Sequence, residues 1–427
     1  MYKLSTLKNA KILTCHLPQM KSVSVGVWIK AGGLYEPAKQ SGISHFIEHL
    51  VFKGTKSRNY QQLKEAIEGS GGMLNAFTSE EYTCFFVKIL SQHLSKSIDI
   101  LLDMVFNAMF SPADITKERL VVFEEIKMYF DLPQHLANDG LVSLLWPEHA
   151  LGRSLLGSFE TLKTISRTEI ISYIHKHYCL DNMLISCSGN IAHNLFINKV
   201  NYFLKKYKIK AKQNFKDNKY DCPKIKQNSS QIKIVHKQIE QMHICLGFHA
   251  LHRQHHLRYA LFLLHIILGA NMSSRLFNEV REKKGLAYEI GSTIKLFQDA
   301  GVFVVHAGVI NDKLVPAVKV IFSEVKRLTK YLVLENEFTR AKEYYRGQIL
   351  MGLEDNLEHM FWASESVLTK GRIELVSSII KKVNAVERKD IRDVARMIFK
   401  KINLNLSVVG PLTKEQSKKL NISVDTF

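Results

Sequence analysis

The segment Ser44–Leu50 holds the residue types and spacing best suited to metal chemistry, since it reads Ser-His-Phe-Ile-Glu-His-Leu. If the segment is helical, His45 and His49 are four residues apart and project from one face, as two ligands of a tetrahedral zinc ion must. Glu48 lies on the same side, where its carboxylate can hold a water molecule beside the metal. Because a metal lowers the pKa of such a water and a carboxylate can accept its proton, the set is suited to attack on a carbonyl group.

Two imidazoles leave a protein ligand to be found, and a carboxylate is the expected third. Glu118 and Glu125 are seven residues apart in a segment that reads as a helix, 113–130, so both lie on one stripe of it. Glu124 lies about 100° around the same helix and would point elsewhere. The residues alone leave open whether Glu118 or Glu125 is the third ligand. They also leave open whether the histidine segment is a metal site or an ordinary polar surface helix.

A weak internal repeat helps to decide between these interpretations. Three regions align without gaps when the chain is shifted by 221 residues, which places Arg167 on Arg388. The paired regions are Arg167–Asn190 with Arg388–Pro411, Ser22–Trp28 with His243–His249 (Gly26 over Gly247), and Lys117–Tyr129 with Phe338–Leu350. At this offset the four residues of the metal set, His45, Glu48, His49 and Glu125, fall on Ile266, Gly269, Ala270 and Arg346. Only the first copy could therefore hold a metal.

The repeat predicts two homologous domains, 1–212 and 230–427, joined by a polar linker, 213–229. Strands and long amphipathic helices alternate within each half, which indicates sheets packed with helices. In the first half we expect a helix over 42–53, directly after a strand that contains Val23 and Val25.

Composition and cysteine usage fit this plan. The chain has 427 residues, of which 46% are hydrophobic and 23% charged, which is typical of globular domains and excludes a disordered chain. Its six cysteines are scattered with no C-x-x-C pair, as expected of buried thiols in a reducing compartment. The first residues lack the apolar stretch of a secretory signal, and the longest apolar run, near 260–268, is too short to span a bilayer. We expect a cytoplasmic protein without a membrane partner.

The net charge of +19 raises the alternative of a nucleic-acid-binding protein, whose affinity would depend steeply on salt. The positive residues are spread along the chain, and the densest stretch, Lys205–Lys226, is polar with little apolar periodicity, as in a solvated linker. No aromatic-interleaved RNA motif or helix-turn-helix pattern stands out. We therefore expect no nucleic-acid partner.

A second group of histidines invites a metal interpretation of its own. The stretch His249–His256 reads His-Ala-Leu-His-Arg-Gln-His-His, directly after an expected strand. Its four histidines, His249, His252, His255 and His256, are interpreted as solvated residues of a loop or a helix start.

Longer motifs surround the residues of the metal set. They are Gly42–Thr55 (GISHFIEHLVFKGT), Asn75–Thr83 (NAFTSEEYT), Glu118 with Glu124–Tyr129 (EEIKMY), Ser273–Phe277 (SSRLF) and Arg281–Tyr288 (REKKGLAY). In these motifs the chain resembles the pitrilysin/insulinase metallopeptidase family, in the branch of mitochondrial processing peptidase and its bacterial homologues. The H-x-x-E-H order is the inverted zinc-protease pattern of that family.

The resemblance implies a zinc endopeptidase that hydrolyses peptides or short unfolded segments. Its fold would be α+β, with two homologous domains, each a mostly antiparallel sheet packed with helices, arranged as a clamshell. One Zn²⁺ per chain would be bound by His45, His49 and Glu125. Glu48 would be the general base for a metal-activated water, and Glu118 a supporting carboxylate.

The resemblance also implies how a peptide substrate would bind. Asn75 and Ala76 would lie on an edge strand that pairs with extended peptide through backbone hydrogen bonds. Arg281 and Tyr288 of the second domain would grip the substrate and stabilise the oxyanion. A homodimer, or a heterodimer with an inactive paralogue, is expected by the same resemblance. The alternative within this fold is a structural subunit without activity, although such proteins typically lose the ligands that this chain retains.

Overall fold

The computed structural model describes residues 1–211 and 227–427, so the predicted linker 213–229 falls almost wholly outside the described residues. The described chain divides into two compact units. Unit 1 holds residues 1–126, 153–211 and 350–374, and unit 2 holds residues 127–152, 227–349 and 375–427.

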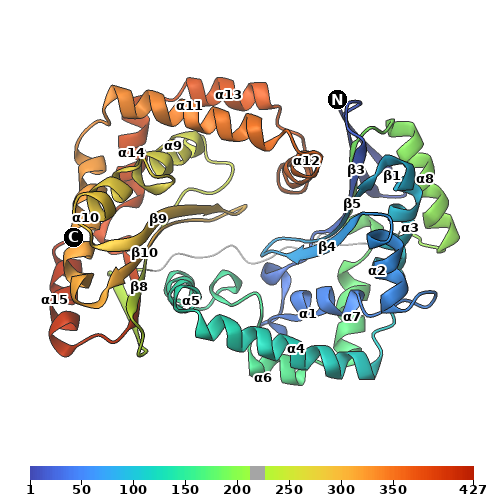
Figure 1. Ribbon diagram of the computed structural model, residues 1–427, viewed down its shortest axis with the longest axis horizontal. Helices are drawn as coiled ribbons and strands as arrows, with labels where there is room; N and C mark the ends of the chain where they lie inside the picture. Colours follow the sequence, from blue (N-terminus) through green and yellow to red (C-terminus); the bar gives the residue numbers. More distant parts are fainter. Residues whose placement is uncertain (212–226) are drawn as a thin grey trace. The chain divides into compact units, whose positions relative to one another are not determined.

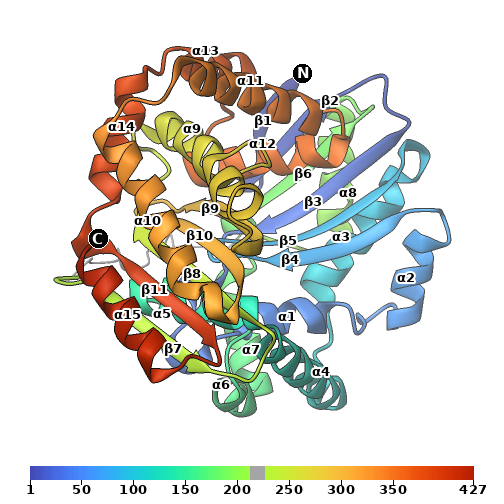
Figure 2. The same ribbon diagram turned by 60° about the vertical axis from the view of Figure 1, so that its left-hand side comes forward.

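Unit 1 is built on a six-stranded sheet in the order β1-β2-β6-β3-β5-β4. Figure 1 labels four of these strands, β1, β3, β5 and β4, and Figure 2 labels all six. Its strands are β1 (Tyr2–Leu7), β2 (Ala10–His16), β3 (Ser22–Ile29), β4 (Met73–Thr78), β5 (Thr83–Leu90) and β6 (Met183–Gly189). The β2–β6 pair is parallel and the other pairs are antiparallel. Helices α3 (Leu94–Asn107) and α8 (His193–Lys206) pack on this sheet, and strand β3 is buried along nearly its whole length because both of its faces are covered.

Unit 2 repeats this plan with five strands in the order β7-β11-β8-β10-β9 (Figure 2). They are β7 (Gln231–His236), β8 (Gln241–His249), β9 (Ala287–Leu296), β10 (Gly301–Ile310) and β11 (Asn405–Gly410). The β7–β11 pair is parallel and the other pairs are antiparallel. Strands β2, β6, β3, β5 and β4 of unit 1 thus correspond in order and direction to β7, β11, β8, β10 and β9. The prediction of two homologous α+β domains with mostly antiparallel sheets is confirmed.

The remaining α-helices, apart from α2, follow the same duplication. In the first half of the sequence they are α1 (Ile43–Val51), α2 (Tyr60–Glu68), α4 (Pro112–Asp131), α5 (Pro133–Leu145), α6 (Phe159–Thr164) and α7 (Arg167–His177). In the second half they are α9 (Arg258–Gly269), α10 (Leu314–Lys330), α11 (Glu335–Gly352), α12 (Asn356–Lys370), α13 (Val376–Asn384), α14 (Arg388–Ile398) and α15 (Lys414–Asp425). The helices predicted over 42–53 and 113–130 are therefore present as α1 and α4. None of the helices in the described ranges has the length and apolar character needed to cross a membrane.

Two helices pack in the unit opposite to their half of the sequence. Helix α5, from the first half, packs on β8 and β11 of unit 2, and α12, from the second half, packs on β2, β3 and β6 of unit 1. The compact units therefore differ from the predicted halves 1–212 and 230–427 by two exchanged segments, 127–152 and 350–374. The repeat cannot reveal this exchange, because both copies of the helix are displaced in the same way and the offset is unchanged.

Gly26 and Gly247 occupy equivalent positions in the two copies. Each lies where the exchanged helix, α12 or α5, packs on the sheet. A Cβ atom on Gly26 would come within 2.7 Å of the Trp28 side chain and 3.1 Å of Met360 on α12. A Cβ atom on Gly247 would come within 2.7 Å of the Leu141 side chain on α5. Close packing of a helix on the middle strand requires the missing side chain in each unit.

Replacing Gly247 by Val should therefore destabilise the protein by about 1–3 kcal/mol, because the larger side chain overpacks the contact between α5 and β8. Chemical unfolding of the purified protein measures the effect. Gly352→Val is the matched control, since no atom lies within 4 Å of a Cβ built there. Equal stability of the two variants would contradict the close-packing account.

The predicted solvation of the histidines after β8 is wrong for His249. This residue ends β8, is only 6% exposed, and packs its ring against Trp146, with 5.6 Å between ring centroids. Burial lowers its pKa to about 4. His252, His255 and His256 lie between β8 and α9 and keep partial exposure, as predicted.

Candidate metal centre

Helix α1 is held at its first turn by a buried carboxylate. Gly42 precedes the helix with φ of 91°, a left-handed conformation, and a Cβ there would lie 2.6 Å from the carbonyl oxygen of Leu156. The backbone N–H groups of Gly42 and Ser44 each donate to the Glu36 carboxylate at 2.8 Å. A negative charge at this end of a helix complements the helix dipole and satisfies otherwise unpaired N–H groups. The start of α1 is therefore fixed in place.

The amphipathic pattern of α1 then orients the polar residues. Its apolar side chains are buried in the core of unit 1; they are Ile43, Phe46, Ile47, Leu50 and Val51. His45, Glu48 and His49 occupy the other face and are partly exposed. The two imidazole rings lie 4.7 Å apart between centroids, with an interplanar angle of 68°.

Helix α4 supplies a carboxylate to the same point. Glu125 Oε2 lies 3.7 Å from His45 Nε2 and 3.5 Å from His49 Nε2. The three residues offer ligand atoms that all lie within 4.8 Å of one another, and no other such group occurs among the residues that the structure describes. The same ring nitrogen of both histidines thus faces one carboxylate oxygen, which is the arrangement expected of ligands around a single ion.

Glu118 lies against the other nitrogen of one imidazole. Its Oε2 is 3.4 Å from His49 Nδ1, and its Oε1 pairs with Lys53 Nζ at 2.5 Å. A carboxylate on Nδ1 fixes the orientation of a histidine that binds a metal through Nε2. The residues alone could not separate Glu118 from Glu125, and the structure places Glu125 beside both Nε2 atoms and Glu118 behind the pair.

The electrostatics of the cluster suit cation binding. Burial, together with the nearby His49, lowers the pKa of His45 to about 4, so the ring is neutral at physiological pH. Contact with His49 lowers the pKa of Glu125, which keeps that carboxylate charged. Burial raises the pKa of Glu48, against a hydrogen bond from Thr78. Burial would lower the pKa of His49, but the surrounding carboxylates outweigh it and raise that pKa.

The donor set fits a divalent ion of the first transition row. Two imidazole nitrogens and one carboxylate oxygen form a three-ligand set that leaves a position open, as in catalytic zinc sites. Glu125 Oε2 is buried without a hydrogen-bond partner among the described residues, and its contacts to the two Nε2 atoms are longer than ordinary hydrogen bonds. An ion at the shared point would satisfy it.

Unit 2 has no counterpart to this cluster. The position equivalent to His45 is Ile266 on α9, and the position equivalent to His49 is Ala270, directly after α9. The position equivalent to Glu125 is Arg346 on α11. The duplication therefore retains the scaffold in both units and the metal-binding residue types in one.

Comparison with known proteins identifies the scaffold. The "Insulinase (Peptidase family M16)" family model matches residues 11–158, and the "Peptidase M16 inactive domain" model matches residues 164–345. A Bacillus subtilis relative named "Uncharacterized zinc protease YmxG" is 34% identical over 413 residues, covering 96% of this chain and 98% of the relative. The chain belongs to peptidase family M16. A Streptomyces coelicolor relative named "Uncharacterized zinc protease SCO5738" is 32% identical over 421 residues, covering 97% of this chain and 90% of the relative.

Solved structures show the same M16 fold. A protease from Helicobacter pylori superposes with a TM-score of 0.90 at 22% identity, covering 96% of this chain and 99% of that one. An M16 inactive-domain protein from Pseudomonas fluorescens superposes with a TM-score of 0.87 at 16% identity, covering 96% and 98%. At these identities the likeness concerns the fold alone.

In this M16 chain, the predicted peptide-docking residues lie on an edge strand. Asn75 and Ala76 belong to β4, which pairs with β5 and ends the sheet. The Asn75 side-chain oxygen accepts a hydrogen bond from the Ala76 N–H at 2.8 Å. The side chain thus satisfies a backbone donor at the sheet edge, and the role of both residues in peptide binding stays a prediction.

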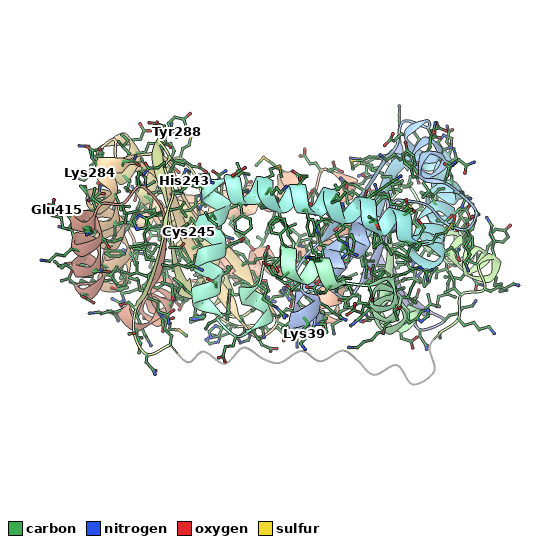
Figure 3. The ribbon with its side chains drawn as sticks, turned by 90° about the horizontal axis from the view of Figure 1, so that it is seen from below. Lys39, His243, Cys245, Lys284, Tyr288 and Glu415 are labelled. Atoms are coloured by element: carbon green, nitrogen blue, oxygen red, sulfur yellow. The ribbon has the colours of Figure 1, made fainter. Side chains whose placement is uncertain are left out.

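Arg281 and Tyr288 lie in unit 2, whereas the metal-binding residue types lie in unit 1. Arg281 belongs to a π-helical turn, Phe277–Glu282, and its guanidinium lies over the rings of Phe277 and Tyr288, 4.6 Å and 5.4 Å from their centroids. Tyr288, labelled in Figure 3, is 73% exposed near the start of β9. The two residues contact each other, and their predicted role towards substrate stays a prediction.

Three residues that the sequence analysis did not assign take part in the site. Lys53 pairs with Glu118, Glu36 caps α1, and the Thr78 hydroxyl donates to Glu48 Oε2 at 2.5 Å. Lys53 and Thr78 fall inside the family motifs, which was the available signal for them. Glu36 lies outside those motifs, and its role follows only from the fold.

Replacing Glu36 by Gln should destabilise the protein by about 1–2 kcal/mol, because one of the two N–H groups of α1 loses its acceptor and the helix dipole loses its charge. Thermal unfolding measures the loss, and titration with a divalent metal should show weaker affinity because α1 carries both histidines. Glu68→Gln, a change at an exposed position on α2, is the control and should leave both quantities unchanged. An unchanged unfolding midpoint for Glu36→Gln would refute the capping role.

Proposed function

We propose that this chain is a zinc endopeptidase that hydrolyses extended peptides or short unfolded segments, with Glu48 as general base. The observation that carries the proposal is the convergence of His45 Nε2, His49 Nε2 and Glu125 Oε2 within 4.8 Å of one another, with the Glu48 carboxylate on the same helix face. Membership of peptidase family M16 and the zinc-protease names of two relatives support the same assignment. When bound, zinc would lower the pKa of a water molecule and polarise the peptide carbonyl.

The ligand residues have separate tasks in this proposal. Burial keeps His45 neutral, so its Nε2 lone pair is available as a ligand. Glu118 holds the ring of His49 from the Nδ1 side, and its own charge is balanced by Lys53. Glu125 brings the negative charge that partly neutralises a divalent ion. The three ligands leave one position for water or substrate.

Glu48 would move the proton. Its carboxylate accepts a proton from the attacking water and delivers it to the nitrogen of the departing amine, so the peptide bond is broken without a covalent enzyme intermediate. Oε2 of Glu48 accepts the hydrogen bond from Thr78, which leaves Oε1 to receive the proton.

Strand β4 would hold the substrate. Because β4 is the edge strand of its sheet, an extended peptide can add to it by main-chain hydrogen bonds. Such pairing depends little on side chains, which is consistent with unfolded segments as substrates. Arg281 and Tyr288 would add donors for the substrate and for the developing oxyanion.

We extend the proposal to the protein's setting and assembly. The five described cysteines are buried, as expected of thiols in a protein of a reducing compartment such as the cytoplasm. Resemblance to the processing-peptidase branch supports a homodimer, or a heterodimer with an inactive paralogue. Sedimentation analysis of the purified chain tests the homodimer directly.

Replacing Glu48 by Gln should abolish peptide hydrolysis, with a loss of at least about a hundredfold, while zinc content stays at wild-type level. His45→Ala should lose both zinc and activity. Elemental analysis and cleavage of a peptide library, with and without chelator, give the two readouts. A Glu48→Gln protein that turns over at the wild-type rate would remove Glu48 from its role, and a wild-type protein without zinc would favour a subunit that shares the fold but not the activity.

Arg281→Ala and Tyr288→Phe should each lower kcat/KM by about a hundredfold or more if these groups stabilise the oxyanion, with zinc content unchanged. Lys284→Ala, a change at a neighbouring exposed position, is the control and should stay near wild type. Wild-type kcat/KM in both variants would show that the Arg281–Tyr288 contact has only a local structural role.

A further inference from the structure

We propose that Thr78 is a positioning residue that holds the general-base carboxylate of Glu48 in its working orientation. The inference rests on the proposed function and adds a residue to it. The observation that carries it is the hydrogen bond from Thr78 Oγ1 to Glu48 Oε2, at 2.5 Å. A donor on a carboxylate at this distance is a short, charge-assisted hydrogen bond.

Thr78 restricts the rotation of the Glu48 side chain. Glu48 is half-buried on the polar face of α1, where its side chain can rotate among several staggered conformations. The hydrogen bond to Thr78 selects one of them and occupies one oxygen. The other oxygen is then presented in a defined direction, as a general base within reach of its proton must be.

Thr78 itself is well fixed. It is the last residue of β4 and lies opposite Thr83 of β5, whose hydroxyl donates to the backbone of Ala31 at 2.8 Å. The following residue, Ser79, closes a tight turn by hydrogen bonds with Tyr82, at 2.9 Å from its N–H and 2.8 Å from its hydroxyl. Because the strand end cannot shift freely, the Thr78 hydroxyl is a rigid reference point for a side chain on a different element.

The same strand carries the predicted peptide-docking residues. Ala76 is two residues before Thr78, so both side chains lie on one face of β4. Strand β4 packs against α1, and the Thr78 hydroxyl contacts Glu48 of that helix. One strand thus joins the edge on which a peptide would pair and the hydroxyl that orients Glu48.

The test compares Thr78→Val, which keeps the shape but removes the hydroxyl, with Thr78→Ser, which keeps the hydroxyl. For a quenched-fluorescence peptide that the wild type cleaves, Thr78→Val should lower kcat about 10–100-fold and change KM less than about twofold. Thr78→Ser should recover most of the rate. Thr6→Val, on the exposed edge strand β1, is the matched control and should behave as wild type.

Two readouts do not depend on turnover. Zinc affinity, and binding of the same peptide to the zinc-free protein, should be equal in wild type, Thr78→Val and Thr78→Ser. Loss of zinc, peptide affinity or thermal stability in Thr78→Val would show a merely structural role and overturn the proposal. Failure of Thr78→Ser to recover the rate would overturn it too. Unchanged kcat in a wild-type-like, zinc-loaded Thr78→Val protein would overturn it as well. If instead the wild type neither binds zinc nor cleaves peptides, the proposed function fails first, and this inference fails with it.

Discussion

Two imidazole nitrogens and one carboxylate oxygen cannot be kept close together without support, since each is polar and the carboxylate oxygen here is buried. The rest of unit 1 supplies that support from several directions. Glu36 anchors the start of α1, the apolar face of α1 fills the core, and Glu118 with Lys53 holds His49 from behind. Helix α4 contributes Glu125, which is far from His49 along the chain. The fold thus directs the Glu125 carboxylate and the Nε2 atoms of the two histidines towards one point.

The proposed general base, Glu48, is contacted by a different element from the one that contacts the proposed ligands. Thr78 on β4 contacts Glu48, whereas the partners of the histidines come from α4. Ligand geometry and carboxylate orientation can therefore respond separately to change. Under the proposed function, the strand that would pair with substrate could thus influence the chemistry without carrying a ligand.

The sequence alone predicted the site residues that lie on one helix, but not the contacts between elements that are distant in the chain. His45, Glu48 and His49 share a helix face because of the 3.6-residue period, which is visible in the chain itself. The choice of Glu125 over Glu118 depended on resemblance to a family, because both residues lie on one stripe and only the packing of α4 decides which reaches the Nε2 atoms. Thr78 and Lys53 lie within the family motifs, but their contacts with Glu48 and Glu118 depend on the tertiary fold.

The burial of His249 shows the same limit from another side. Its ring is covered by Trp146, which belongs to the exchanged segment 127–152. Nothing in the neighbourhood of His249 along the chain indicates a partner that far away. The duplicated strand order was accessible from the repeat, whereas the exchange of helices was not.

The exchange of α5 and α12 has a consequence for biosynthesis. While the chain emerges from the ribosome, the sheet of unit 1 has all its strands once residue 189 is made, but the helix that covers one of its faces ends only at residue 370. During that interval the apolar surface around Trp28 and Phe86 is not yet covered by α12. The nascent protein therefore passes through a partly folded, aggregation-prone state, in which chaperone protection would be most valuable.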